Sequence, residues 1–215
     1  GVSLGEQPDL ELLDPGGQWQ DNMTFETIRY ETEGPIAWIT LNRPEKLNAI
    51  DTVMTGELMA ATDRAQLDDE VRVVVVKGEG RAFSAGLDLE PRVQQDLENP
   101  EDVERVKADL GKHFDMILRF WDSPKPTIAA VHTYCIGAGL ELALACDLIV
   151  MADDAYLMSP FTSIGIIPDG GATWLLARQL GYYRAYEFCA EGARMVADDC
   201  LSAGLANRVV PAADL

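Results

Sequence analysis

Two glycine-bearing turns are the parts of this sequence best suited to hold a negatively charged ligand atom. Residues 81–88 read RAFSAGLD and residues 135–141 read CIGAGLE, and each turn follows a segment predicted to be a buried strand. Small residues let a ligand approach the backbone closely, and ligands of α/β proteins bind at the carboxyl ends of the strands. The second turn also opens a predicted helix, whose free amides favour negative charge on a bound oxygen. Either turn alone is more often an ordinary connection between a strand and a helix, but the pair indicates a binding site.

A single carboxylate, Glu141, stands in the helix that follows the second turn. Its neighbours Leu140, Leu142, Ala143 and Ala145 are all apolar. A charged side chain is unusual in such a helix unless it is paired with an opposite charge or used in chemistry. Glu141 is therefore a candidate functional residue, and a buried salt bridge is the alternative.

The elements that carry these turns alternate between strands and helices. Residues 25–30 and 36–41 predict a hairpin, a helix capped by Asp51 runs to about Leu67, and the β-branched run at 72–78 predicts a strand buried on both faces. This order is the βαβ pattern of an α/β domain. The rest of the chain predicts a helix at 106–121, a strand at 127–132, a helix at 137–146, a strand at 147–151, helices at 170–180, 182–191 and 196–203, and a strand at 208–210.

Composition limits the class of protein. The chain has 215 residues, 47% of them hydrophobic, so one globular domain is expected. A membrane-spanning protein is excluded, because no apolar run approaches the roughly 20 residues that span a bilayer. Acidic residues outnumber basic ones 36 to 17, and the net charge of -19 disfavours nucleic acid as a partner. The four cysteines form no CxxC pair, so we expect reduced, buried thiols and no metal.

The first part of the chain differs from the rest. Residues 1–22 are polar and without period, and they predict a flexible leader before Met23. No basic segment followed by an apolar one marks a secretory signal, so a cytoplasmic location is expected. Residues 23–215 are expected to form the folded core.

Four ordered motifs resemble the signatures of the enoyl-CoA hydratase/isomerase (crotonase) family. They lie at residues 39–49, 82–89, 125–143 and 165–171, and the resemblance extends over nearly all of the chain from Phe25 to Leu215. It implies a crotonase-like spiral of ββα units, in which a mixed, largely parallel sheet is flanked by helices. Residues 23–215 would then form an acyl-CoA-binding core, with coenzyme A bound as part of the substrate and no tightly bound cofactor.

The resemblance also implies which residues form the site. The amides of Leu87 and Ala138 would form an oxyanion hole for the thioester carbonyl oxygen, which stabilises charge that develops only in the enolate. Arg43 and Lys46 are candidate partners for the coenzyme A phosphates, although ordinary surface charge explains them as well. The acyl-CoA channel would be lined by Ser84, Ala85, Leu87, Gly137, Gly139 and Phe161.

Two glutamates handle the water in hydratases of this family, and this sequence matches one of them. Glu141 corresponds to the first, whereas the position of the second holds Phe161, which cannot accept or deliver a proton. Asp169, eight residues further on, is similar to the acid that moves a proton between acyl carbons in isomerases of the family. We therefore expect double-bond isomerisation slightly ahead of hydration. The alternative role for Asp169 is an N-cap of the helix that follows.

Several other interpretations remain open. His113 and His132 are expected to be core or supporting residues, and a dehalogenase, whose histidine would fall at Phe114, is a remote option. The rival function is a catalytically silent acyl-CoA-binding or scaffolding relative. Family members usually continue past a motif like that at 206–211 into three helices that close the acyl pocket and build a trimer. We expect this segment to be lacking here, so a homotrimer or a dimer of trimers is expected only if such helices exist.

Overall fold

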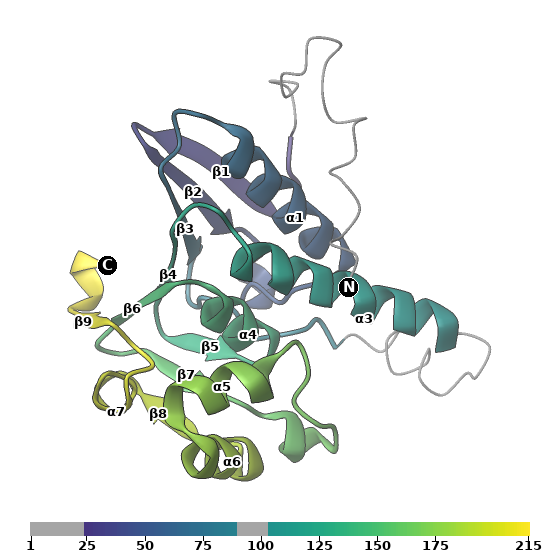
Figure 1. The fold of residues 1–215 in the computed structure, drawn as a ribbon, viewed down its shortest axis with the longest axis vertical. Coiled ribbons are helices and arrows are strands. Elements are labelled where there is room, and N and C mark those ends of the chain that lie inside the picture. Colours follow the sequence, from purple (N-terminus) through teal and green to yellow (C-terminus); the bar gives the residue numbers. More distant parts are fainter. Residues whose placement is uncertain (1–23, 90–102) are drawn as a thin grey trace.

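Two sheets organise the protein (Figure 1). The computed structural model describes residues 24–89 and 103–215, so the expected leader at 1–22 and residues 90–102 lie outside the described residues. The larger sheet has the order β1-β2-β3-β4-β6-β9 and the smaller one the order β5-β7-β8. The strands are β1 (Ile28–Glu33), β2 (Ile36–Leu41), β3 (Val73–Gly78), β4 (Thr127–Val131), β5 (Tyr134–Ile136), β6 (Leu148–Ala152), β7 (Tyr156–Met158), β8 (Arg194–Val196) and β9 (Arg208–Val210).

The larger sheet is mixed and largely parallel. β1 and β2 pair antiparallel, whereas β2 with β3, β3 with β4, β4 with β6 and β6 with β9 all pair parallel. Together with the flanking helices, this arrangement confirms the predicted fold class. The parallel strands end side by side, so the connections after β3 and β4 emerge at the same edge of the sheet.

Helices flank the sheets, and one of them, α4, lies in the centre of the protein. They are α1 (Thr52–Leu67), α3 (Val103–Trp121), α4 (Ala138–Ala145), α5 (Ala172–Leu180), α6 (Tyr182–Glu191) and α7 (Ala197–Ala203), with short 3-10 turns η2 (Pro44–Lys46), η4 (Phe161–Ile164) and η5 (Ala212–Asp214). α1 and α3 pack side by side (Figure 1). All residues of α4 are buried, which accounts for its apolar sequence. Within the described ranges, no helix is both long and apolar enough to cross a membrane.

The cap predicted for the first helix is confirmed, and several predicted boundaries were wrong. The Asp51 carboxylate accepts a hydrogen bond from the Met54 amide at 2.8 Å. The first strand begins at Ile28 instead of Phe25, because the backbone amide of Thr27 donates to the Glu57 side chain at 2.8 Å and not to a neighbouring strand. The helix predicted from residue 170 begins at Ala172, since Gly170 and Gly171 adopt positive φ angles of 50° and 84°.

Three strands of the small sheet were missed by the sequence analysis. β5, β7 and β8 have three residues each, too few for an alternating pattern to be recognised. β5 matters most, because it separates β4 from α4 and runs beside the turn at Ser84. The second glycine-bearing turn therefore follows β5 and not β4.

Candidate active site

The structure brings the two glycine-bearing turns into direct contact. Ser84 forms a parallel bridge with Cys135 of β5, in which the Ser84 amide donates to the Tyr134 carbonyl at 2.9 Å and the Ile136 amide donates to the Ser84 carbonyl at 3.0 Å. Beyond this bridge, a Cβ atom added to Gly86 would lie 3.0 Å from the carbonyl oxygen of Ile136 and 3.6 Å from the amide nitrogen of Ala138. Only glycine permits this approach, which is also helped by its positive φ of 100°.

Two backbone amides near this contact have no partner in the part of the chain that the structure describes. The Gly86 carbonyl accepts from the Ile50 amide at 2.8 Å and the Asp88 amide donates to the Ile50 carbonyl at 2.9 Å, so the backbone on both sides of Leu87 is held. Ala138 is the first residue of α4 and is 2% exposed. Within residues 24–89 and 103–215, neither the Leu87 amide nor the Ala138 amide donates to a protein acceptor. Unpartnered amides at a helix start favour a negatively charged oxygen.

Small residues keep the surroundings of these amides tight. A Cβ atom on Gly139 would lie 2.6 Å from the Cβ atom of Ser84, so α4 packs directly on the first turn. The Ser84 hydroxyl donates to the Asn48 carbonyl at 2.8 Å and accepts from the Gly86 amide at 3.2 Å. The buried ring of Phe161 lies about a van der Waals contact from the position a Cβ atom would take on Gly137. An apolar ring therefore stands beside the second turn.

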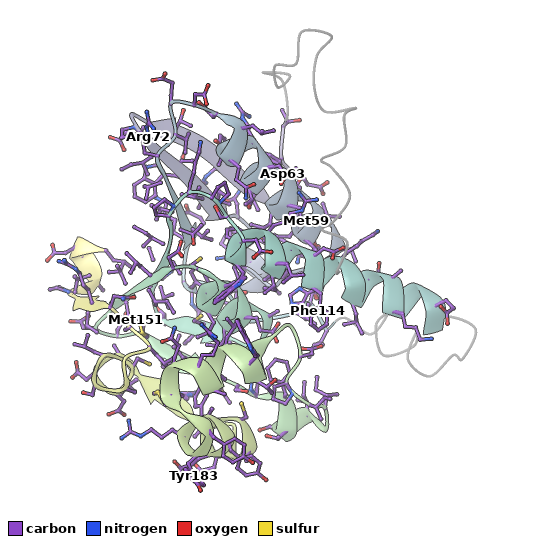
Figure 2. The ribbon with its side chains drawn as sticks, in the orientation of Figure 1. Met59, Asp63, Arg72, Phe114, Met151 and Tyr183 are labelled. Atoms are coloured by element: carbon purple, nitrogen blue, oxygen red, sulfur yellow. The ribbon has the colours of Figure 1, made fainter. Side chains whose placement is uncertain are left out.

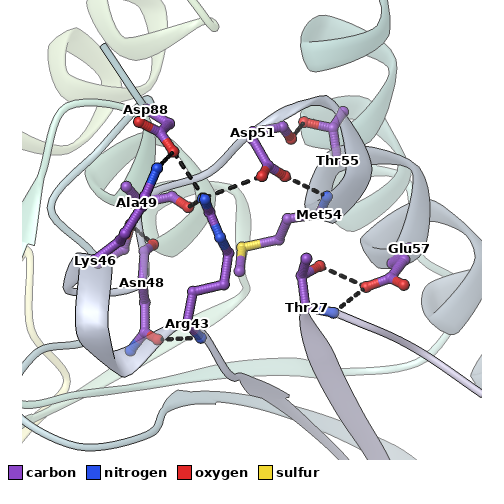
Figure 3. Close-up of polar contacts among 11 residues, drawn as sticks. Thr27, Arg43, Lys46, Asn48, Ala49, Asp51, Met54, Thr55, Glu57 and Asp88 are labelled. Carbon is purple, nitrogen blue, oxygen red and sulfur yellow. Dashed lines mark hydrogen bonds and ion pairs between the residues drawn. The ribbon is translucent and has the colours of Figure 1, made fainter. Parts of the chain in front are cut away.

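Arg43, Lys46, Asp51 and Asp88 form a charged cluster, the Arg43–Asp88 cluster, next to the first turn (Figure 3). The Arg43 guanidinium donates to the Asp88 carboxylate at 2.8 Å and to the Ala49 carbonyl at 2.6 Å, and it lies 3.2 Å from the Asp51 carboxylate. The Lys46 ammonium group donates to the same Asp88 oxygen at 3.2 Å. Partial burial tends to raise the pKa of Asp88, but the hydrogen bonds from Arg43 and Lys46 outweigh it and hold this pKa below its ordinary value.

Arg43 and Lys46 make their contacts within the protein, in the Arg43–Asp88 cluster. Asp88 directly follows Leu87, so the cluster anchors the segment that carries one of the two unpartnered amides. Arg43 is mostly buried and its donors point at protein acceptors. The structure thus places Arg43 and Lys46 within the scaffold of the first turn, and their predicted contact with coenzyme A phosphates stays a prediction.

Glu141 pairs with a residue to which the sequence analysis gave no chemical role. Its Oε2 atom lies 2.9 Å from Nε2 of His113 on α3, and the two residues are 1% and 3% exposed. Burial raises the pKa of Glu141 above its ordinary value and the nearby Asp169 carboxylate adds to this, whereas the hydrogen bond and charge of His113 act in the opposite direction. Oε1 of Glu141 and Nδ1 of His113 are buried without a hydrogen-bond partner among the described residues.

The sequence of α3 contains a pattern that predicts burial of His113. His113, Met116, Ile117 and Phe120 are all buried, and they recur at the spacing of one helix face. A helical projection of α3 would have placed His113 on the inward face. His132, in contrast, lies at the surface and its ring nitrogen contacts the Gly80 carbonyl oxygen at 3.0 Å.

Asp169 lies beside Glu141 and does not cap a helix. The N-cap of α5 is Gly171 and it makes no side-chain cap bond, so the N-cap interpretation of Asp169 was wrong. Asp169 is half-buried, and its carboxylate is one of the causes of the raised pKa of Glu141. Gly170 follows it, and a Cβ atom there would overlap the Glu141 carboxylate.

An open apolar cavity of about 360 Å³ is lined in part by the two glycines that follow Asp169. Phe114, which follows His113, extends from α3 toward the half of the molecule that contains α5 (Figure 2). Gly170 and Gly171 complete the wall next to Asp169. The full lining is Phe114, Ile117, Leu118, Trp121, Gly170, Gly171, Trp174 and Leu175. An apolar chain therefore has a place to bind beside the carboxyl groups.

Comparison with known proteins identifies related chains. A family model described as enoyl-CoA hydratase/isomerase matches residues 31–215. A probable enoyl-CoA hydratase from Rhodobacter capsulatus is 39% identical over 193 residues, 89% of this chain and 72% of the relative. The human mitochondrial Delta(3,5)-Delta(2,4)-dienoyl-CoA isomerase is 33% identical over 221 residues, 98% of this chain and 62% of the relative. A Thermobifida fusca YX structure in complex with acetoacetyl-CoA has a TM-score of 0.77 at 30% identity and covers 87% of this chain and 75% of that one.

Replacement of Gly170 by alanine is expected to destabilise the protein by about 1 to 3 kcal/mol, because the new Cβ atom meets the Glu141 carboxylate and the backbone there has a positive φ. The matched control is Gly56→Ala in α1, where an added Cβ atom meets nothing within 4 Å. That change should stabilise the helix by about 0.5 to 1 kcal/mol. Urea unfolding of both variants measures the difference, and equal midpoints would show that Gly170 does not abut Glu141.

Replacement of Asp88 by asparagine is expected to lower the free energy of unfolding at pH 7 by about 1 to 2 kcal/mol, because charge-assisted hydrogen bonds to Arg43 and Lys46 are lost. A carboxyl group with a lowered pKa stabilises the fold above its ordinary pKa, and this contribution disappears as the pH falls through the lowered value. The difference between variant and parent should therefore shrink below about pH 4. Asp198→Asn, at an exposed site, is the control. A constant difference down to pH 2 would contradict the assignment.

Proposed function

Because the chain belongs to the enoyl-CoA hydratase/isomerase family, we propose that it binds acyl-CoA thioesters and stabilises their enolate between the amides of Leu87 and Ala138. One observation carries this proposal. Two backbone amides that meet no acceptor among the described residues stand on two turns that touch each other at Gly86 and Ile136. An oxygen bound to both amides would gain most when it carries the full negative charge of the enolate, so the pair favours the transition state over the resting thioester.

The carboxylates near this site favour isomerisation over hydration. Hydration adds a hydroxyl group at one carbon and a proton at the next, so it needs groups that activate water and deliver a proton. At the position where the resemblance to the family implies one such group, this chain has Phe161, whose side chain is buried. Isomerisation needs only that a carboxylate remove a proton from C2 of a 3-enoyl thioester and that a proton return at C4, which moves the double bond into conjugation.

Asp169 is the proposed carrier of that proton, with Glu141 beside it as the second acid–base group. The Asp169 side chain is not the N-cap of α5, and Asp169 lies between Pro168 and Gly170, where the wall of the apolar cavity begins. That cavity suits the acyl chain, and the complex of the Thermobifida fusca YX protein with acetoacetyl-CoA supports a thioester ligand of this kind. Coenzyme A would enter as part of the substrate.

Replacement of Asp169 by asparagine is expected to reduce kcat for the conversion of trans-3-enoyl-CoA by about 100-fold or more, because the carboxylate that carries the proton is lost. The appearance of the conjugated thioester band in the ultraviolet measures this reaction. Binding of acetoacetyl-CoA, measured by calorimetry, should change little, since an amide has nearly the same size as a carboxylate. Asp198→Asn serves again as the exposed control.

The unmodified protein decides between the reactions in the same assay. Gain of the band with trans-3-enoyl-CoA supports isomerisation. Loss of the band with trans-2-enoyl-CoA would instead establish hydration and would favour Glu141 as the principal acid–base group. Binding of acetoacetyl-CoA without turnover of either substrate would identify a catalytically silent acyl-CoA-binding protein.

A further inference from the structure

The contact between His113 and Glu141 joins two helices at the centre of the protein. His113 lies in the middle of α3 and Glu141 in the first turn of α4, 28 residues apart, with their Nε2 and Oε2 atoms at 2.9 Å. Both side chains are almost completely removed from solvent. The other histidine of the chain, His132, lies at the surface on a backbone carbonyl oxygen. Only one of the two histidines is therefore placed to influence a carboxyl group of the site.

A carboxylate in this position faces a severe electrostatic penalty. Transfer of a lone carboxylate out of water is unfavourable, and the like charge of Asp169 makes ionisation of Glu141 harder still. His113 is the group that opposes both effects. Of the other charged groups on α3, Lys112 and Asp115 are exposed, Arg119 pairs with Asp63 of α1, and Asp109 lies one turn before His113 and is half-buried. Within the described ranges, the other charged group that acts on Glu141 is Asp169, which precedes α5.

We propose that His113 is a positioning residue of the site: it donates a hydrogen bond from Nε2 to Oε2 of Glu141, keeps that carboxylate ionised, and leaves Oε1 as the oxygen available to the substrate. This inference rests on the proposed function, in which Glu141 is an acid–base group. The geometry supports the assignment of the two oxygens. Oε2 contacts His113, whereas Oε1 is buried and meets no hydrogen-bond donor among the described residues, although the Asp169 carboxyl group lies near the same carboxylate.

Phe161, which lies beside the second turn, changes the number of negative charges around Glu141. Removal of a carboxylate from the site takes away one acid–base group but also one negative charge that would compete with Glu141 for ionisation. The remaining like charge is that of Asp169, and one imidazole opposes it. Control of the charge of Glu141 thus comes from a neighbouring helix, α3, and not from a second glutamate near the substrate.

The test is the pH dependence of kcat/KM for whichever enoyl-CoA the protein converts, in His113→Leu and His113→Gln. Loss of the imidazole removes the influence that lowers the pKa of Glu141, so the base form would be lost at a higher pH as the solution is acidified. In His113→Leu, the acid limb of the plot of kcat/KM against pH should move up by about 1 to 3 pH units. Activity on the alkaline plateau should stay within a few-fold of the parent. His113→Gln keeps a donor near the Nε2 position but no charge, and it should fall between the two. His132→Gln is the matched control and should keep the parental profile.

An equal loss of activity at every pH, with the acid limb of the profile unmoved, would overturn the proposal and leave His113 a packing residue.

Nitrogen NMR of protein labelled at histidine gives a second readout that needs no turnover. With two histidines in the chain, His132→Gln assigns both sets of signals. Nε2 of His113 should carry hydrogen. The nitrogen chemical shift of this atom should change in Glu141→Gln and not in His132→Gln. An unprotonated Nε2 would overturn the proposal even in a protein that converts neither enoyl-CoA, so its failure is distinguishable from failure of the proposed function.

Discussion

The close approach of two backbone segments, at Gly86 and at Ile136–Ala138, is the constraint on which the rest of the site depends. Side chains cannot intervene there, since even a methyl group on Gly86 would lie 3.0 Å from a carbonyl oxygen. The parallel pairing of β3 with β4 brings the two connections to one edge of the sheet, and the bridge at Ser84 then sets their register. The bonds of Ile50 on both sides of Leu87 hold the segment while leaving one amide unused. A rigid scaffold thus presents two backbone donors without any reactive side chain.

A second constraint follows from placing a carboxyl group inside this close-packed region. All residues of α4 are buried, Glu141 is 1% exposed, and only a glycine at position 170 leaves room for its carboxylate. The energetic difficulty is met by hydrogen bonding to a neighbouring helix and not by exposure. Burial also makes the pKa of Glu141 more sensitive to its neighbours, because each nearby charge acts more strongly where water is excluded. The carboxyl group and its surroundings therefore have to be considered together.

Much of the fold was predictable from the sequence, because strong local signals agreed with the tertiary structure. The β-branched run of β3, the Asp51 cap of α1 and the two glycine-bearing turns are such signals. The three-residue strands of the small sheet were not predictable, since they form only because neighbouring segments supply their partners. The same holds for the site: the acid–base candidates follow from motifs, whereas the pairing of His113 with Glu141 depends on how α3 lies across α4. The helical spacing of His113 predicts an inward direction but not a partner.

The charge of the protein sets a final condition on how it can select a ligand. The chain carries a net charge of -19, and the two cations of the Arg43–Asp88 cluster are matched by the two carboxylates of the same cluster. This cluster therefore exerts little attraction on an anionic thioester at long range. Under the proposed function, attraction of that kind would in any case strengthen binding of the substrate and of the transition state alike. The amides of Leu87 and Ala138 would differ in this respect, because in the proposed site they act at short range on the one atom where charge develops. Under the proposed function, the cations that fix the backbone beside Leu87 would contribute to catalysis through the position of a neutral donor.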